Sequence, residues 1–175
     1  IIEGLDQPLY VSSTVLAVVA GGYVIAAIFS GGLGDRFGIA RVILAASVVY
    51  GVGLSLAVLA HRWHWWYYGL IAPVAIAGGT VMTLSWGLLF KLMPPRDRGA
   101  ISGLAIMTKG VGLLVGPLAV GAVIDIFTPV LRSTDGYGAM WLAVGLPVLA
   151  VLPLVLRLVE AEDRAATRTE TSPVA

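Results

Sequence analysis

The stretch Gly31-Gly32-Leu33-Gly34-Asp35-Arg36-Phe37-Gly38 decides how this chain folds. Its two charged residues separate two long segments that carry no charge at all, 7–34 and 42–60. A transmembrane helix needs about 20 mainly apolar residues to cross the hydrocarbon core. The stretch is therefore predicted to be a short turn at the membrane surface between two antiparallel transmembrane helices.

The rest of the chain repeats this pattern. The sequence is 58% hydrophobic and only 12% charged, which is too little charge for the surface of a soluble domain. Three more segments are uncharged except for Lys109: 65–90, 99–124 and 136–156. The expected fold class is therefore all-α and integral to the membrane, a bundle of five transmembrane helices.

The expected boundaries follow from the positions of the charges. The helices are predicted at about 9–33, 42–60, 65–91, 99–125 and 137–158. Residues 1–6 are expected to be an external stub or the remnant of a preceding helix, since the chain begins without Met and reads as a fragment. The membrane bundle is expected to span 7–158 and a polar tail 159–175. Within the tail, Glu160 and Arg164 are spaced to pair on a short helical extension, and the residues after it read as disordered.

Other function classes find little support. Barrel strands would alternate polar and apolar residues, and 42–60 does not. The net charge of +1 and the lack of a basic patch argue against a nucleic-acid partner. The absence of cysteines excludes thiolate metal sites, and no hydrolase, zinc-protease or nucleotide-binding motif occurs. No enzyme activity, metal or cofactor is therefore expected.

The distribution of basic residues predicts the topology. One side of the membrane receives eight of them: Arg36, Arg41, Lys91, Arg96, Arg98, Arg157, Arg164 and Arg168. The other side receives only Arg62 and Arg132, together with the aromatic cluster at 63–68 that is typical of a membrane interface. The positive-inside rule then places the turn at 35–41 and the C-terminus in the cytoplasm.

Three motifs in order resemble those of the major facilitator superfamily of secondary transporters. The first is Gly31-x-Leu33-x-Asp35-Arg36-x-Gly38, followed by Arg41. The second is the turn at 94–99, Pro-Pro-Arg-Asp-Arg-Gly, and the third is a glycine–proline helix with Gly112, Gly116, Pro117 and Gly121. The resemblance covers essentially the whole chain and implies a transporter of a small solute.

The first motif departs from the family pattern in one respect. Two basic residues often follow its last glycine, whereas this chain has Ile39 and Ala40 there. A degenerate copy is typical of the C-terminal half of these proteins. The chain is therefore interpreted as helices eight to twelve, which would work with a missing N-terminal bundle. The rival interpretation is helices two to six of the N-terminal half.

The chemistry of the first motif suggests roles for individual residues. Asp35 is suited to accept hydrogen bonds from the N-terminal amides of a neighbouring helix or to pair with an arginine, and Arg36 to bind a carboxylate or lipid phosphate, as a gate latch. The alternative is that both charges only keep the turn in water. The glycines of the turn and of 99–121 are expected to let helices pack closely, and Pro117 to bend its helix.

Lys109 is the one formal charge well inside an apolar segment. Such a charge is costly and marks a functional site unless the side chain reaches the headgroups. Both interpretations stay open. The further candidates for a substrate cavity are Thr108, Thr80, Thr83, Trp86 and Tyr23. Thr80 and Thr83 are three residues apart and are expected on one helix face.

The predicted function is secondary active transport by alternating access, with proton coupling in symport or antiport. The alternative is a sensor or interaction module on the same membrane scaffold. The predicted partners are a small-molecule solute and the lipid bilayer, and the predicted location is a bacterial inner membrane. The sequence does not identify the solute.

Overall fold

The computed structural model describes residues 9–59, 64–94, 96–131 and 136–171. Every regular element in these ranges is helical. The elements are α2 (Leu9–Phe37), α3 (Ile39–Leu56), the short 3₁₀ helix η1 (Ala57–Leu59), α4 (Tyr67–Leu92), α5 (Arg98–Phe127), α6 (Gly138–Ala150) and α7 (Leu152–Thr171). The all-α membrane fold class predicted from composition is confirmed.

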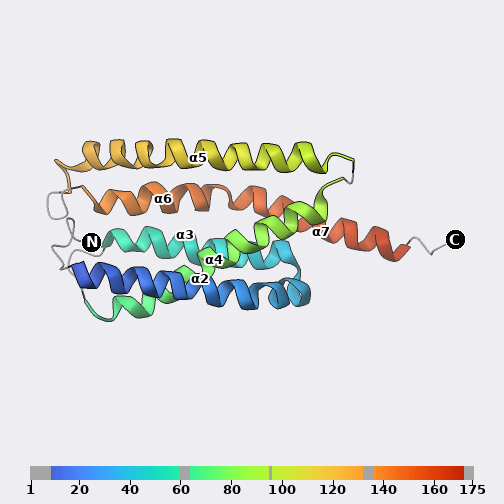
Figure 1. Ribbon diagram of the computed structural model, residues 1–175, viewed down its shortest axis with the longest axis horizontal. Helices are drawn as coiled ribbons and strands as arrows, with labels where there is room; N and C mark the ends of the chain where they lie inside the picture. Colours follow the sequence, from blue (N-terminus) through green and yellow to red (C-terminus); the bar gives the residue numbers. More distant parts are fainter. Residues whose placement is uncertain (1–8, 60–63, 95, 132–135, 172–175) are drawn as a thin grey trace.

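Five helical segments are long and apolar enough to cross a membrane. They are Tyr10–Phe37, Ile39–Leu59, Tyr67–Leu92, Arg98–Phe127 and Gly138–Glu160. They lie side by side along the long axis of the molecule, with α4 crossing the bundle obliquely and α5 at one edge beside α6 (Figure 1). Of these five, α5 has no buried residue, so it is the helix least enclosed by this chain.

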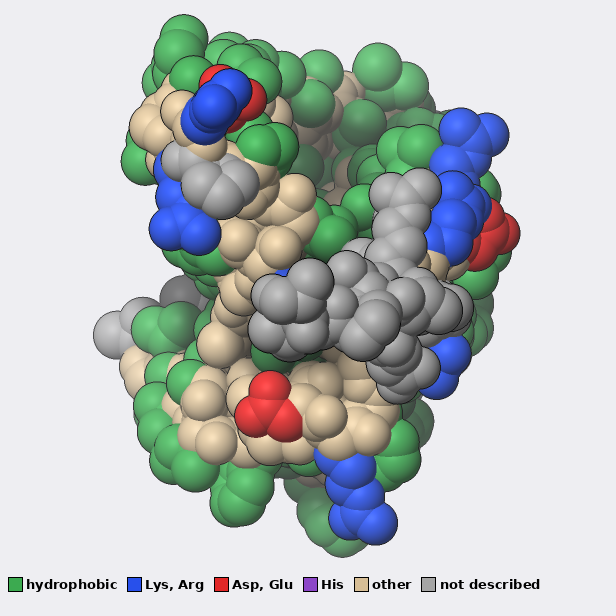
Figure 2. Space-filling model, turned by 90° about the vertical axis from the view of Figure 1, so that its right-hand side faces the viewer, with side chains coloured by type: hydrophobic (Ala, Val, Ile, Leu, Met, Phe, Trp, Pro, Cys, Tyr) green, Lys and Arg blue, Asp and Glu red, His purple; other side chains and the backbone are tan. Residues whose placement is uncertain are grey.

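One end of the bundle collects several helix termini. The end of α2, the start of α3, the end of α4, the start of α5 and the far part of α7 all lie there (Figure 1). We call it the motif end because it contains residues 31–41. Basic side chains lie around the rim of this face (Figure 2).

The first motif is mostly helical rather than a turn. The prediction ended the first helix near residue 33, but α2 continues through the motif to Phe37, and α3 begins at Ile39. Only Gly38 interrupts the two helices, with φ 89° and ψ 133°. A residue with a Cβ rarely adopts this backbone conformation, so the sharp reversal depends on glycine.

The last span is divided, and it extends further than predicted. The expected helix at 137–158 is α6 and α7, separated at Val151. Pro153 lies two residues after Val151, and because it has no N–H it cannot donate to the carbonyl of Leu149 as a helical residue would. Beyond the span, α7 remains helical to Thr171, which includes residues expected to be disordered. The expected pair forms: Arg164 donates to Glu160 at 3.0 Å.

Small residues determine how the helices pack. Gly22 and Ala26 of α2 face Ala75 and Gly79 of α4, and all four are buried. A Cβ on Gly79 would lie 2.8 Å from the Ala26 Cβ. The absence of bulk at these positions lets the two backbones approach closely, which is how helices gain packing energy in lipid.

A second close contact joins α3 to α6. Gly145 lies against Ser55, where an added Cβ would come 2.9 Å from the backbone nitrogen. Gly51, one turn earlier on α3, lies against Leu149. This contact positions α6 and α7 beside α3, and thereby brings α7 to the motif end.

Candidate functional site

The residues of the first motif lie at the end of α2 and the start of α3. Asp35, Arg36 and Arg41 are exposed, and Leu33 is 45% exposed. The Arg36 guanidinium lies 5.4 Å from the ring centroid of its neighbour Phe37. In the described ranges, no hydrogen bond or ion pair is recorded for Asp35, so the amide contacts expected of it are not made inside this bundle.

The motif glycines differ in their surroundings. A Cβ on Gly34 would lie 3.3 Å from side-chain atoms of Ile39 and Leu84, so this glycine does permit close packing. Gly31 and Gly32 are exposed, and an added Cβ there would meet nothing within 4 Å. The close approach expected at these two positions is therefore not made by the described part of the chain.

A different carboxylate reaches the start of α3. Glu162 of α7 accepts hydrogen bonds from the backbone amides of Ala40, at 2.8 Å, and Ile39, at 3.4 Å. Its other partner is Lys91, in the last turn of α4, whose Nζ lies 2.5 Å from Oε1. The Glu162 side chain is 8% exposed, whereas that of Lys91 is 52% exposed. One buried carboxylate of α7 therefore contacts two other helices, α3 and α4, at the motif end.

The surroundings of Glu162 favour its charged form. Burial by itself raises the pKa of this carboxyl. The hydrogen bond and the charge of Lys91, with the amides of Ala40 and Ile39, outweigh burial, so the pKa of Glu162 lies below its ordinary value. The group is an anion at neutral pH and is unsuited to exchange protons there.

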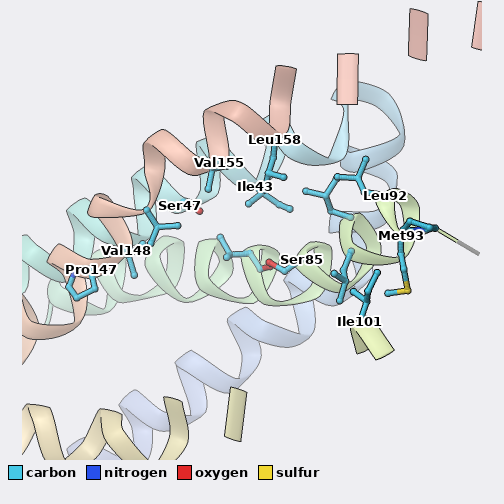
Figure 3. A pocket seen from close by; sticks show the side chains of 15 residues that line it. Ile43, Ser47, Ser85, Leu92, Met93, Ile101, Pro147, Val148, Val155 and Leu158 are labelled. Carbon is cyan, nitrogen blue, oxygen red and sulfur yellow. The ribbon is translucent and has the colours of Figure 1, made fainter. Parts of the chain in front are cut away.

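A cavity of about 690 Å³ lies between the helices, and its lining includes Leu158, one helical turn before Glu162. It is bounded by α3, α4, α6, α7 and the start of α5, and its walls are mainly aliphatic (Figure 3). Ser47 and Ser85 contribute hydroxyl groups, although the Ser85 hydroxyl donates to the carbonyl of Val81 at 2.5 Å. Leu92 and Leu158 line the part nearest the motif end. Such a cavity suits apolar groups and has few positions for a polar one.

The predicted cavity residues on α2 and α4 are not gathered at this cavity. Thr80 is buried and donates to the carbonyl of Ile76 at 2.9 Å, while Thr83 is exposed, so the two threonines differ in environment. Tyr23 packs at Gly79 in the α2–α4 contact. Trp86 is half-buried, and its ring centroid lies 6.3 Å from that of Phe90.

The predicted residues on α5 lie apart from those on α4. Lys109 and Thr108 are both exposed, and Thr108 donates to the carbonyl of Leu104 at 2.9 Å. An added Cβ at Gly112, Gly116 or Gly121 would meet nothing within 4 Å. Their role in helix packing, and that of Pro117, stays a prediction for a partner outside the described ranges.

Sequence reasoning did not single out Glu162 or the small-residue contacts. The contacts had a readable signal: Gly22 and Ala26, like Ala75 and Gly79, are small residues four apart. Glu162 had none, because its partners lie 71 to 123 positions away in the chain. Glu160 and Asp163 lie close to Glu162 in the chain, and nothing in the sequence distinguishes Glu162 from these two acidic residues.

Comparison with known proteins agrees with the three motifs. The sequence model described as Major Facilitator Superfamily matches residues 4–174. The chain is 28% identical over 127 residues to "Multidrug resistance protein MdtH" of Proteus mirabilis. This alignment covers 71% of the chain but 29% of the relative. The chain thus spans less than a third of the relative's length. No solved structure matches the chain.

Proposed function

Because the chain belongs to the major facilitator superfamily, we propose that its bundle is part of a secondary active carrier. The carrier moves a small solute by alternating access, and proton movement drives it. The observation that carries this proposal is the family match over residues 4–174, on a chain whose five apolar helices are each long enough to cross a membrane. The family supports membrane transport in general. Proton coupling and alternating access are the parts that we propose.

We further propose that this bundle is the C-terminal half, helices eight to twelve, and rocks against an N-terminal bundle of the same polypeptide. Two features of α5 support a missing partner. None of its residues is buried, and a Cβ added at Gly112, Gly116 or Gly121 would meet nothing within 4 Å in the described ranges. In this arrangement Lys109 and Thr108 face a cavity shared by the two halves, with Tyr23, Thr80, Thr83 and Trp86 as further contacts.

The motif end is proposed to face the cytoplasm of a bacterial cell. The rim of basic residues there supports this orientation under the positive-inside rule (Figure 2). Asp35 and Arg36 are exposed at this end. They are therefore free to act as a latch that contacts the second bundle in one state and releases it in the other.

The solute class is proposed from the relative. The name of that protein refers to multidrug resistance, and the aliphatic cavity of this chain is compatible with apolar organic compounds. Export of small lipophilic molecules is therefore the form of transport to test first.

The test uses the complete polypeptide in proteoliposomes. Ethidium and Hoechst 33342 are suitable fluorescent probes, with an imposed pH gradient as the driving force and protein-free liposomes as the control. We expect flux that follows the gradient and stops when a protonophore is added. Flux that the protonophore leaves unchanged would contradict proton coupling. Absence of flux across a broad panel of solutes would favour the sensor alternative.

A further inference from the structure

The segment after the last membrane span contains a structural contact of the bundle. The span ends at Glu160, and Glu162 lies one half-turn beyond it. Although it is outside the span, Glu162 is 7% exposed, in contrast to Glu160 with its 65% exposed side chain. A carboxylate buried to this extent at a membrane surface needs compensating partners.

The first partner is the start of α3. The first amides of a helix have no acceptor within the helix, and they carry partial positive charge. Gly38, which precedes α3, has no side chain to cap them, and α3 has no side-chain cap of its own. Glu162 supplies the missing acceptor for the amides of Ile39 and Ala40.

The second partner is the end of α4. Lys91 lies in its last turn and forms an ion pair with the same carboxylate. Ala40, one of the amide donors to Glu162, belongs to the same buried apolar cluster as Ile43, Leu88 and Val155, which come from the same three helices. The polar contact therefore covers the end of a hydrophobic core shared by α3, α4 and α7.

Chain neighbours of the contact line the cavity. Leu92 follows Lys91 in the chain, and Leu158 lies one helical turn before Glu162; both are lining residues. The positions of these two leucines depend on α4 and α7 staying together. A loss of the Glu162 contacts would let α7 move and would change the shape of the cavity at these leucines.

We propose that Glu162, Lys91 and the amides of Ile39 and Ala40 form a permanent staple, which fixes α7 to α3 and α4 throughout the transport cycle. All its members belong to this one bundle, so rocking of the bundle as a rigid body leaves it intact. This last step rests on the function proposed above. Asp35 differs, because it is exposed and has no recorded partner in the described part of the bundle. The staple makes α7 to residue 162 part of the fold rather than a dispensable tail.

The experiment compares Glu162→Asp and Glu162→Gln with the matched control Glu160→Gln in the complete protein. Asp keeps the charge but is one methylene shorter, and Gln keeps the length but loses the charge. Residue-resolved hydrogen exchange in lipid nanodiscs reports on the amides of Ile39 and Ala40. We expect about tenfold faster exchange in both Glu162 variants, because a hydrogen bond to a charged group is lost or weakened. The control should exchange like the wild type.

Two truncations give an independent measurement if a substitution prevents folding. A stop after Arg164 keeps Glu162, and a stop after residue 161 removes it. We expect only the second to speed exchange at Ile39 and Ala40 and to lower the melting temperature. Equal behaviour of the two truncations, or of Glu162→Gln and Glu160→Gln, would overturn the staple.

Whether the staple stays intact throughout the transport cycle is tested in proteoliposomes under an imposed pH gradient. Protection of the two amides should be the same with and without the gradient. Faster exchange under the gradient would show that the contacts open during the cycle, which would replace the staple by a gate. None of the static measurements requires transport, so they decide the staple even if the protein carries no solute.

Discussion

Gly22 of α2 lies so close to Ala75 of α4 that a Cβ on the glycine would come within 2.8 Å of the Ala75 Cβ. The same added atom would lie 3.2 Å from the backbone nitrogen of Ile76, which cannot move without shifting α4. The α2–α4 contact therefore depends on the absence of a single methyl group. Close backbone approach of this kind is a main source of helix association in lipid.

Gly22→Ala is expected to destabilise the bundle by about 1–3 kcal/mol, the usual cost of overpacking a well-packed contact. The neighbouring Gly21 provides a matched control, because an added Cβ there meets nothing within 4 Å. Gly21→Ala should leave stability unchanged or raise it slightly, since alanine favours helix more than glycine. Thermal unfolding in detergent measures both. Equal melting temperatures for the two variants would contradict the close contact.

Much of the fold was predictable because lipid imposes simple requirements. Long uncharged segments must be helices, and the charges mark their ends. The structure differs from the prediction where individual residues determine the course of the backbone. The motif around Asp35 contains charges but remains helical to Phe37, since Gly38 alone is enough to reverse the chain. The α7 extension is polar by composition, yet a single buried carboxylate fixes it to the bundle.

The candidate site was less predictable than the fold. Single residues such as Lys109 and Thr83 could be identified by type, but their neighbours depend on which helix faces which. Small residues four apart, as in Gly22 and Ala26, predict close packing only when the partner helix is known. Glu162 finds its amide partners through the packing of α3 against α6, which no local pattern in the sequence encodes.

Gly38→Ala should destabilise the junction of α2 and α3 through the backbone. With φ at 89°, a Cβ at this position costs about 1–3 kcal/mol of strain, although the space around it is open enough for ordinary contacts. Gly31→Ala, in the same motif but helical and without near neighbours, is the control. A lower melting temperature for the Gly38 variant alone is the expected result. Equal melting temperatures would show that the backbone can relax at residue 38.

The Glu162 contacts should be insensitive to pH in the physiological range. The pKa of Glu162 lies below its ordinary value, which is about 4.3 for a glutamate. The stability that the folded environment gives to the charged form is thus fully present above the ordinary pKa, and it is lost as pH falls through the folded pKa. Lys91 forms the ion pair with this carboxylate.

The difference in melting temperature between wild type and Glu162→Gln is the measurement for this prediction. It should be constant from about pH 6 to pH 8 and shrink below about pH 4. A difference that changes between pH 6 and pH 8 would mean that the carboxyl titrates there and is a proton carrier.

Asp35→Asn is expected to impair transport without loss of stability. The side chain is exposed and has no recorded contact within the described part of the bundle, so removing its charge disturbs no packing there. A latch to a second bundle would nevertheless be weakened. The measurement pairs solute flux in proteoliposomes with the melting temperature and the amount of protein in the membrane. Wild-type flux in Asp35→Asn would end the latch hypothesis and leave Asp35 as a solvated charge.

Lys109→Gln is expected to reduce transport at least tenfold while the protein inserts and unfolds like the wild type. Lys109 is exposed on α5, a helix that buries none of its residues in this chain, so the substitution removes no internal contact. Its charge lies about 15 Å along the helix from Gly99. Burying a charged ammonium at that depth in the bilayer is energetically unfavourable, so such a residue usually has a function. If the charge itself acts on the solute or on proton movement, Lys109→Arg should retain most of the flux and Lys109→Gln should change its pH dependence. Unchanged solute affinity and pH profile in Lys109→Gln would show instead that the side chain only extends to the headgroup region.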